Sequence, residues 1–325
     1  MAPISGDSSP SAQNDISFIR QSLKNSKPLE LLMTKILLDT DIGTDVDDAV
    51  CLAYLLSHPN CELLGITTVT GESEKRASLA SVLCQAAGRD IPIYPGADKP
   101  MQGEQRQPVA QQAAALPRWP HQAKFPMNQA VDFLANTIRT YPNEITLLSI
   151  GPLTNMGLLF STYPDIAEVL GGLVMMGGNF DEFGPEAQRV EWNVAGDLLA
   201  SEIAYKAPVR LHRSLGLNVT QQVMMSADEV RAKFIAPLLR PVMDMAEIWF
   251  AQFYPFITFH DPLAAATIFE PDLCSYQKGT VTVDNADMPG KTIWQPGGSE
   301  SPHQVAMTVD VDRYFQHFFS VVGFG

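Results

Sequence analysis

The sequence alternates short apolar runs with longer segments in which apolar residues recur every three or four positions. The short runs are at 36–38, 63–69, 91–94, 145–150, 173–176 and 209–211, and the helical segments at 48–56, 76–87, 129–141, 197–205, 227–234 and 238–253. Strands that alternate with helices build βαβ units around a mainly parallel sheet. We therefore predict an α/β fold with an open, mainly parallel sheet flanked by helices. The run 91–94 is expected at a strand start or a sheet edge, because Pro92 cannot donate to a ladder.

The length of 325 residues would allow two domains, but no internal repeat or break in composition marks a boundary. Residues 1–33 lack the apolar core that a signal peptide needs, so we predict a flexible N-terminal extension followed by one domain over 34–325. Residues 101–126, rich in Gln, Ala and Pro, are the least periodic part of that domain. This segment is predicted to be either a mobile functional loop or a disordered insert.

Composition excludes several classes of protein. With 46% hydrophobic and 18% charged residues the chain is not intrinsically disordered. It carries 36 Asp and Glu against 22 Lys and Arg, a net charge of −14, with no local basic patch, so neither nucleic acid nor an anionic membrane is an expected partner. Gly151, Pro152 and Asn155 interrupt the longest uncharged run, 145–164, which argues against a membrane span.

Cysteine usage points to the redox compartment. The four cysteines are far apart and form no C-x-x-C pair; they are Cys51, Cys61, Cys84 and Cys274. This spacing favours buried structural thiols in a reduced, cytoplasmic protein over a disulfide framework.

The segment 39–48 reads D-T-D-I-G-T-D-V-D-D and lies between a predicted strand and a predicted helix. It holds five carboxylates, those of Asp39, Asp41, Asp45, Asp47 and Asp48. So many carboxylates cannot all stay ionised this close together without a compensating cation, and a helix dipole would be satisfied by one or two of them. Ligands that are all oxygen indicate Ca²⁺ or Mg²⁺. An EF-hand is excluded because Val50 stands where its twelfth-position Glu would be.

Two known patterns compete for this cluster. An aspartyl phosphatase motif, D-x-D-x-[TV], would use Asp39 as the nucleophile and Asp41 as the acid/base around Mg²⁺, but Gly43 occupies its last position. The second pattern, D-x-D-x-G-x-D-D after the first strand, fits with two extra residues before the final pair.

Downstream blocks of the second pattern follow in order. They are I-T-T-V-T-G at 66–71, L-L-S-I-G-P-L-T-N at 147–155, M-M-G-G at 175–178, E-W-N at 191–193 and H-D-P at 260–262. Six blocks, each at a predicted strand end or helix start, make the chain resemble the nucleoside hydrolase family of the inosine-uridine preferring type over about residues 34–325.

The resemblance implies roles for individual residues. The implied calcium ligands are the side chains of Asp41, Asp48 and Asp261 and the backbone carbonyl of Ile150. The implied substrate contacts are Asp47, Met176, Glu191, Asn193 and, where the family usually has Asn, Glu72. Asp41 would also be the general base, and His260 would lie beside the leaving base.

The implied activity is calcium-dependent hydrolysis of the N-glycosidic bond of ribonucleosides, giving free base and ribose, by a homodimer or homotetramer. Glu72, Pro185 and the absence of a histidine-glycine motif after the third strand depart from the family pattern and leave the preferred base open. Two alternatives remain at this point, an Mg²⁺-dependent phosphatase and a nucleoside-binding protein without turnover. Also open are whether Asp45 or Asp47 faces the ribose and whether the aromatic residues of 249–259 line the site or pack in the core.

Overall fold

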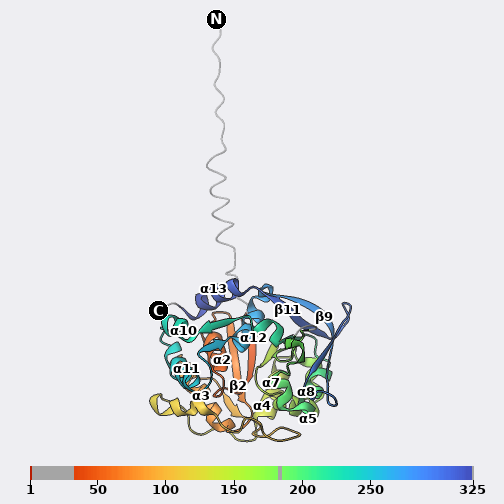
Figure 1. The fold of residues 1–325 in the computed structure, drawn as a ribbon, viewed down its shortest axis with the longest axis horizontal. Coiled ribbons are helices and arrows are strands. Elements are labelled where there is room, and N and C mark those ends of the chain that lie inside the picture. Colours follow the sequence, from red (N-terminus) through yellow and green to blue (C-terminus); the bar gives the residue numbers. More distant parts are fainter. Residues whose placement is uncertain (2–32, 182–184, 324–325) are drawn as a thin grey trace. The chain divides into compact units, whose positions relative to one another are not determined.

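A nine-stranded sheet organises the chain from residue 34 onward in the computed structural model, which describes Met1, residues 33–181 and residues 185–323 (Figure 1). Its strand order is β10-β9-β11-β6-β5-β4-β1-β2-β3. The strands are β1 (Thr34–Thr40), β2 (Cys61–Thr68), β3 (Ile93–Pro95), β4 (Ile145–Ser149), β5 (Gly172–Met176), β6 (His212–Leu215), β9 (Cys274–Val283), β10 (Thr292–Pro296) and β11 (His303–Val309). The predicted extension over residues 1–33 lies almost entirely outside the described residues.

The sheet is mainly parallel, as predicted. Neighbouring strands from β3 through β2, β1, β4, β5 and β6 to β11 all pair in parallel, and only β9 runs against its neighbours β11 and β10. The strand that contains Tyr94 is at the edge of the sheet, where the nearby Pro92 removes no ladder donor. Parallel strands end at the same edge, so the segments that follow β1, β4 and β5 are brought together there.

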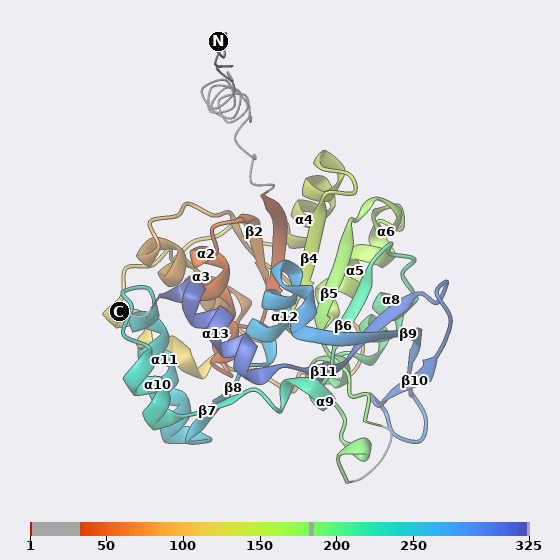
Figure 2. The same ribbon diagram turned by 90° about the horizontal axis from the view of Figure 1, so that it is seen from above.

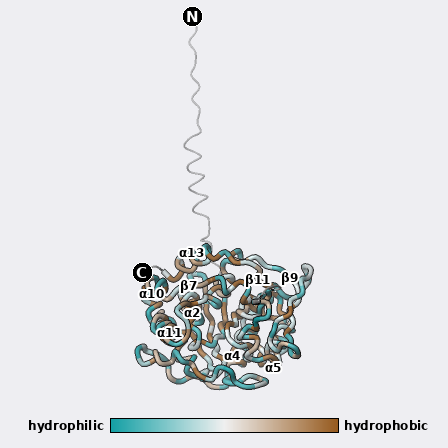
Figure 3. The backbone as a smooth tube through the Cα atoms, viewed as in Figure 1, coloured by the Kyte–Doolittle hydropathy of each residue, from teal (hydrophilic) through white to brown (hydrophobic). Residues whose placement is uncertain are grey.

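Side chains of successive strand residues pack on opposite faces of the sheet. Ile36 and Leu38 belong to one core and Leu37 to the other, because side chains alternate along a strand. Helices α2 (Asp47–Ser57), α3 (Ser73–Ala86), α11 (Leu239–Gln252), α12 (His260–Phe269) and α13 (Val311–Val322) contribute to the first core. Helices α4 (Ala130–Thr140), α5 (Thr154–Thr162), α6 (Ile166–Val169) and α8 (Leu198–Lys206) contribute to the second. Figure 2 shows α12 and α13 in front of the strands, and the hydropathy colours of Figure 3 show hydrophobic stretches within the unit and hydrophilic ones at its rim.

Several predicted elements need correction. The strand predicted at 209–211 is wrong: β6 begins at His212. The sequence H-R-S-L lacks the apolar pattern of a strand, because His212 is buried as a polar residue: its Nε2 donates to the Ala204 carbonyl and its ring stacks on the Tyr205 ring. The strands β9, β10 and β11 and the helices α5, α12 and α13 were not predicted.

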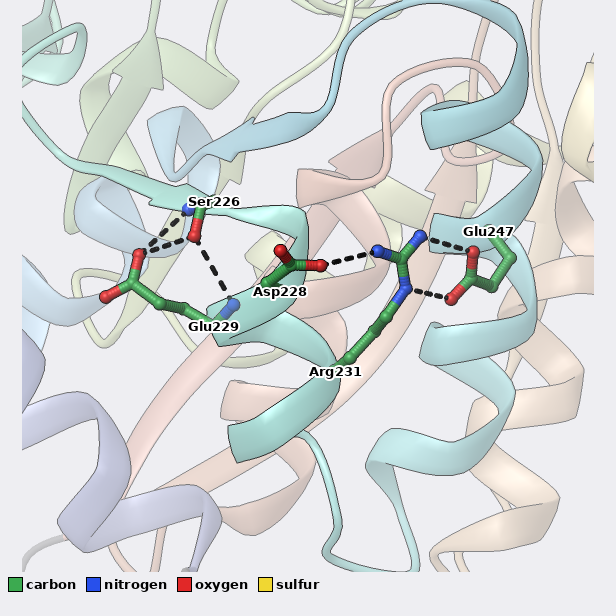
Figure 4. Close-up of polar contacts among 5 residues, drawn as sticks. All are labelled: Ser226, Asp228, Glu229, Arg231 and Glu247. Atoms are coloured by element: carbon green, nitrogen blue, oxygen red, sulfur yellow. Dashed lines mark hydrogen bonds and ion pairs between the residues drawn. The ribbon is translucent and has the colours of Figure 1, made fainter.

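A second, smaller sheet and one helix lie beside α11. A two-stranded sheet of β7 (Met224–Ser226) and β8 (Phe256–Thr258) flanks α10 (Ala227–Lys233), which begins in a capping box between Ser226 and Glu229. Arg231 of α10 donates two hydrogen bonds to Glu247 of α11, at 2.7 and 2.9 Å, and one to Asp228 (Figure 4). These pairs are exposed, and the one between Arg231 and Glu247 joins α10 to α11, a helix that reaches the candidate site.

The remaining short elements are α7 (Trp192–Gly196), α9 (Leu217–Thr220) and the 3-10 helices Gln111–Arg118, Pro185–Gln188 and Pro271–Leu273. Among the described residues, none of the helices has the length and apolarity required to cross a membrane. The four cysteines are free and buried.

Candidate active site

A cavity of about 490 Å³ opens at the carboxyl ends of the parallel strands. Asp41 follows β1, Ile150 follows β4 and Met176 ends β5, so each reaches the cavity from a strand end. The wall also includes Asp45, Asp47, Asp48, Gln107, Glu191, Trp192, Asn193, Trp249, Phe253, Tyr254, His260 and Asp261. Residues that are up to 220 positions apart in the sequence are therefore neighbours here.

Three buried carboxylates converge at the floor of this cavity. Asp47, Asp48 and Asp261 each offer an oxygen, and these oxygens lie within 4.8 Å of one another. The first turns of α2 and α12 carry them, where the helix dipole favours negative charge. Burial, reinforced by mutual repulsion, raises the pKa of all three well above the ordinary value. The group therefore needs either bound protons or a cation.

Hydrogen bonds orient this acidic group. The Thr40 hydroxyl donates to Asp48 Oδ1 at 2.5 Å, and the Asp41 backbone N–H donates to the same oxygen at 3.2 Å. The Asp261 N–H donates to Asp47 Oδ2 at 3.2 Å, which joins the starts of α2 and α12. The loop between β1 and α2 makes a close turn at Gly43, where φ is +120° and a Cβ would lie 2.7 Å from the Leu79 side chain.

Asp41 faces the same cavity beside the group of three. Its Oδ2 accepts a hydrogen bond of 2.8 Å from Gln107 Nε2, and its carbonyl accepts one from Arg76. Burial raises the pKa of Asp41, while Arg76 and Gln107 act in the opposite direction. A Cβ on Gly151 would lie 2.9 Å from both the backbone nitrogen and Oδ1 of Asp41, so the carboxylate packs directly against that glycine.

Arg76 supports the acidic loop through hydrogen bonds, and the sequence analysis did not identify it. Its side chain is fully buried, and besides Asp41 its guanidinium donates to the carbonyls of Gly71 at 2.8 Å and Ile42 at 3.2 Å and to Thr44 Oγ1 at 3.1 Å. Burial lowers the pKa of Arg76. An arginine three positions before Leu79, on the apolar face of a helix, was the available signal, since arginine is rarely fully buried unless it has partners.

The segment 101–126 forms part of the wall of the site. Gln107 is buried and lines the cavity, which argues against a disordered insert, while a mobile functional loop stays a prediction. Gln112, in the 3-10 helix, ties the segment to the acidic loop through its N–H to the Gly43 carbonyl at 2.9 Å and its amide to the Thr44 carbonyl at 3.0 Å. The sequence of 101–126 shows little hydrophobic periodicity because contacts with the rest of the chain, rather than a regular helix or strand, determine how this segment folds.

Three of the residues predicted to contact the sugar, Met176, Glu191 and Asn193, lie together in the cavity wall. Glu191 caps α7, because its carboxylate accepts from the N–H groups of Asn193 at 2.6 Å and Val194 at 3.0 Å. Asn193 Nδ2 donates to the Ile150 carbonyl at 2.9 Å and to the Met176 carbonyl at 3.2 Å. The cap thereby positions the amide that holds the Ile150 carbonyl in place.

His260 and part of the aromatic run also line the cavity. His260 Nδ1 is 2.7 Å from Thr220 Oγ1, and burial lowers its pKa to about 4. Trp249 stacks on Phe253 with ring centroids 4.8 Å apart and lines the cavity, whereas Phe259 is fully buried in the core. Phe253 is 44% exposed and Tyr254 54% exposed, so these rings form the cavity's outer rim. Both alternatives for the aromatic run therefore hold, for different residues.

The structure does not bring Glu72 into this cavity. Its carboxylate pairs with Lys75 and accepts from the Ala110 N–H at 3.0 Å. The backbone at Glu72 is left-handed, with φ +61°, a conformation that Asn adopts more readily than Glu. Pro185 begins the 3-10 helix that precedes Glu191.

Asp39 also lies away from the cavity. It is fully buried, and its Oδ1 accepts hydrogen bonds from Thr67 at 2.5 Å and Asn155 at 2.7 Å. The phosphatase alternative needs this carboxylate as its nucleophile, so the geometry argues against that alternative.

Comparison with known proteins agrees with the geometry. The sequence model of the inosine-uridine preferring nucleoside hydrolase family matches residues 36–316. Similar curated proteins include uridine nucleosidase 1 of Arabidopsis thaliana, 29% identical with 87% of this chain and 91% of that protein covered, and a non-specific ribonucleoside hydrolase of Salmonella paratyphi B, 31% identical with 86% and 95% covered. A similar solved structure, a purine-preferring ribonucleoside hydrolase from Gardnerella vaginalis, has a TM-score of 0.77 and 25% identity, with 89% of this chain and 98% of that chain covered.

Proposed function

This chain belongs to the inosine-uridine preferring nucleoside hydrolase family and is a ribonucleoside hydrolase, and we propose that it cleaves the N-glycosidic bond with the help of a calcium ion. The proposed ligands are the side chains of Asp41, Asp48 and Asp261 and the carbonyl of Ile150. The convergence of buried carboxylates in a cavity of about 490 Å³ is the observation that carries the proposal. A cavity of that size can enclose a nucleoside.

The donor set fits a hard divalent cation. Every candidate ligand atom is an oxygen, and Ca²⁺ takes six to eight oxygens from carboxylates, carbonyls and water. Burial and then mutual repulsion raise the pKa values of Asp48 and Asp261, and a cation would offset both effects. Asp47 lies in the same group, and we propose that its carboxylate is shared between this site and the ribose hydroxyls. When bound, the ion supplies positive charge and Lewis acidity at the floor of the cavity.

The chain's own residues perform the proton transfer and the positioning. Asp41 accepts a proton from the attacking water, whose oxygen bonds to C1′ of ribose as the bond from C1′ to the base nitrogen breaks. The electron pair of that bond leaves with the base. Glu191 and Asn193, held by the α7 cap and by the Ile150 carbonyl, orient the sugar against this attack.

His260 assists the departing base. Because burial lowers its pKa to about 4, the imidazole is neutral at pH 7. We assign the Thr220 hydroxyl as the donor to Nδ1, which leaves the hydrogen on Nε2, and this N–H donates a hydrogen bond to the base nitrogen that gains the electron pair. The Trp249 ring, which also lines the cavity, offers an apolar surface to a planar base.

The decisive experiment measures free ribose released from a panel of purine and pyrimidine nucleosides in Ca²⁺, in Mg²⁺ and in EDTA. We expect release in Ca²⁺ and its loss in EDTA; full activity in EDTA would refute the metal assignment. Asp41→Asn should lower kcat by at least ~10²-fold, the scale of general base catalysis. Asp165→Asn, at an exposed ion pair with Arg139, is the control. A protein that binds nucleosides without releasing ribose would be the non-catalytic alternative.

The family resemblance also leads us to propose a cytoplasmic homodimer or homotetramer that supplies free bases for salvage. Light scattering of the purified protein tests the assembly, and fractionation of cells tests the location. The names of the similar proteins differ in the base that they specify, being uridine, non-specific and purine-preferring, so the same panel also identifies the preferred base.

A further inference from the structure

Gln107 bridges two parts of the site that the sequence places 151 positions apart, Asp41 and Trp192. Its Nε2 donates to Asp41 Oδ2 at 2.8 Å, and its Oε1 accepts from the Trp192 indole N–H at 2.6 Å. Gln107 is buried, whereas Trp192 is 47% exposed. The bridge therefore runs from the floor of the cavity to its rim.

The bridge has a defined direction. An indole N–H can only donate, so it selects the carbonyl end of the Gln107 carboxamide and leaves the NH₂ end facing Asp41. An NH₂ group is the partner that an ionised carboxylate requires. If the amide were reversed, the Gln107 carbonyl oxygen would lie against the Asp41 carboxylate, and the Trp192 indole N–H would have no acceptor.

The neighbouring residues hold both ends of the bridge. The Arg106 guanidinium lies over the Trp192 ring, 5.3 Å from its centroid, and donates to the Ala195 carbonyl at 3.0 Å. The Gln107 N–H donates to Gln105 Oε1 at 2.8 Å. Two successive side chains of the loop are thus attached to α7, which carries the predicted sugar contacts.

We propose that Gln107 is a positioning residue for Asp41, with its amide oriented by Trp192. This inference rests on the proposed function, in which Asp41 is the general base. Gln107 restrains Oδ2 while Gly151 packs against Oδ1, so the carboxylate is held from two sides. Each carboxylate oxygen retains a second lone pair for the proton of water. Gln107 itself takes no part in the proton transfer.

The test compares steady-state kinetics of variants in saturating Ca²⁺. Gln107→Ala should lower kcat by about 10- to 100-fold, the value expected for a lost hydrogen bond to a charged group, with KM changed less than about threefold because substrate binding is retained. Gln107→Glu keeps the shape but places a second carboxylate against Asp41, so its kcat should be at least as low. Gln102→Ala, at an exposed glutamine of the same segment, should behave like the unmodified protein.

Trp192→Phe provides a readout that a purely structural role would not give. It keeps the ring and removes the N–H, so kcat should fall by a smaller factor, and the double variant with Gln107→Ala should be no slower than Gln107→Ala alone. Multiplicative losses in the double variant, or an unchanged kcat in Gln107→Ala, would overturn the inference. An increase in KM with an unchanged kcat would overturn it as well.

Failure of the proposed function has a different signature. If the unmodified protein releases no ribose from any nucleoside in Ca²⁺, the function is wrong and the inference falls with it. If the unmodified protein is active and Gln107→Ala matches it, only the role of Gln107 is wrong. Circular dichroism melting of each variant shows whether a lost rate reflects unfolding.

Discussion

Substitution of Gly151 by alanine tests how closely the catalytic geometry depends on packing around Asp41. A Cβ at this position would lie 2.9 Å from both Asp41 N and Asp41 Oδ1 and 2.8 Å from Val69 Cγ1. Ordinary contacts of a Cβ begin at about 3.4 Å, so Asp41 must move by roughly 0.5 Å. Gly151 also follows Ile150, so the shift affects a second proposed calcium ligand.

The expected magnitude follows from that shift. A misplacement of about 1 Å at a reacting group costs about 10²-fold in rate, so a movement of half that size should lower kcat about 10-fold. Overpacking of a buried site costs about 1–3 kcal/mol of stability, which lowers the melting temperature by a few degrees. Ribose release at saturating nucleoside and Ca²⁺ measures kcat, and calorimetry measures the melting temperature.

Two other glycines separate local from global effects. A Cβ on Gly157 would lie 2.6 Å from Ala200 in the packing of α5 on α8, so Gly157→Ala should be destabilised to a similar extent and keep its kcat. Gly298→Ala has open space around the new methyl group and should change neither property. If Gly151→Ala retains full kcat, or if Gly157→Ala loses as much, the position of Asp41 does not control the rate as we argue.

Three further outcomes are expected. Removal of Ca²⁺ with EDTA should lower the melting temperature, and more at pH 8 than at pH 5. Burial and repulsion raise the pKa values of the acidic cluster above their unfolded values, so the folded, metal-free chain binds more protons than the unfolded chain and its stability falls as pH rises. Scanning calorimetry at both pH values checks this, and a metal-independent melting temperature would contradict it. Asp47→Asn should impair turnover far more than Asp45→Asn in the ribose assay, and the reverse order would transfer the ribose contact to Asp45. His260→Ala should slow natural nucleosides by about 10²-fold but barely affect a nitrophenyl riboside, whose leaving group needs no hydrogen-bond donor; equal losses on both substrates would remove His260 from its assigned role.

The sequence by itself was sufficient for the fold class and for most residues of the cavity. Alternating strand and helix patterns depend on local periodicity, and parallel strands bring their following segments to one edge whatever the details of packing. The acidic segment after β1 could therefore be placed at the ligand-binding edge of the sheet. The H-D-P segment at the start of α12 follows a strand of the two-stranded sheet and was assigned to the same site only through the family resemblance. Glu72 was the exception, because its left-handed backbone and its contacts with Lys75 and Ala110 are properties of the folded loop.

Tertiary structure alone decided which residues support those that were predicted. Nothing in the periodicity of 101–126 shows that Gln107 reaches Asp41, since this segment is folded by contacts with the acidic loop and with α7. The same holds for Arg76, which stabilises the site by donating to the carbonyls of Asp41 and Ile42. Because every residue has a carbonyl, the sequence does not show which ones Arg76 contacts. Side-chain chemistry and spacing can be read along the chain, whereas hydrogen bonds to backbone groups and between distant loops depend on distances that exist only after the chain has folded.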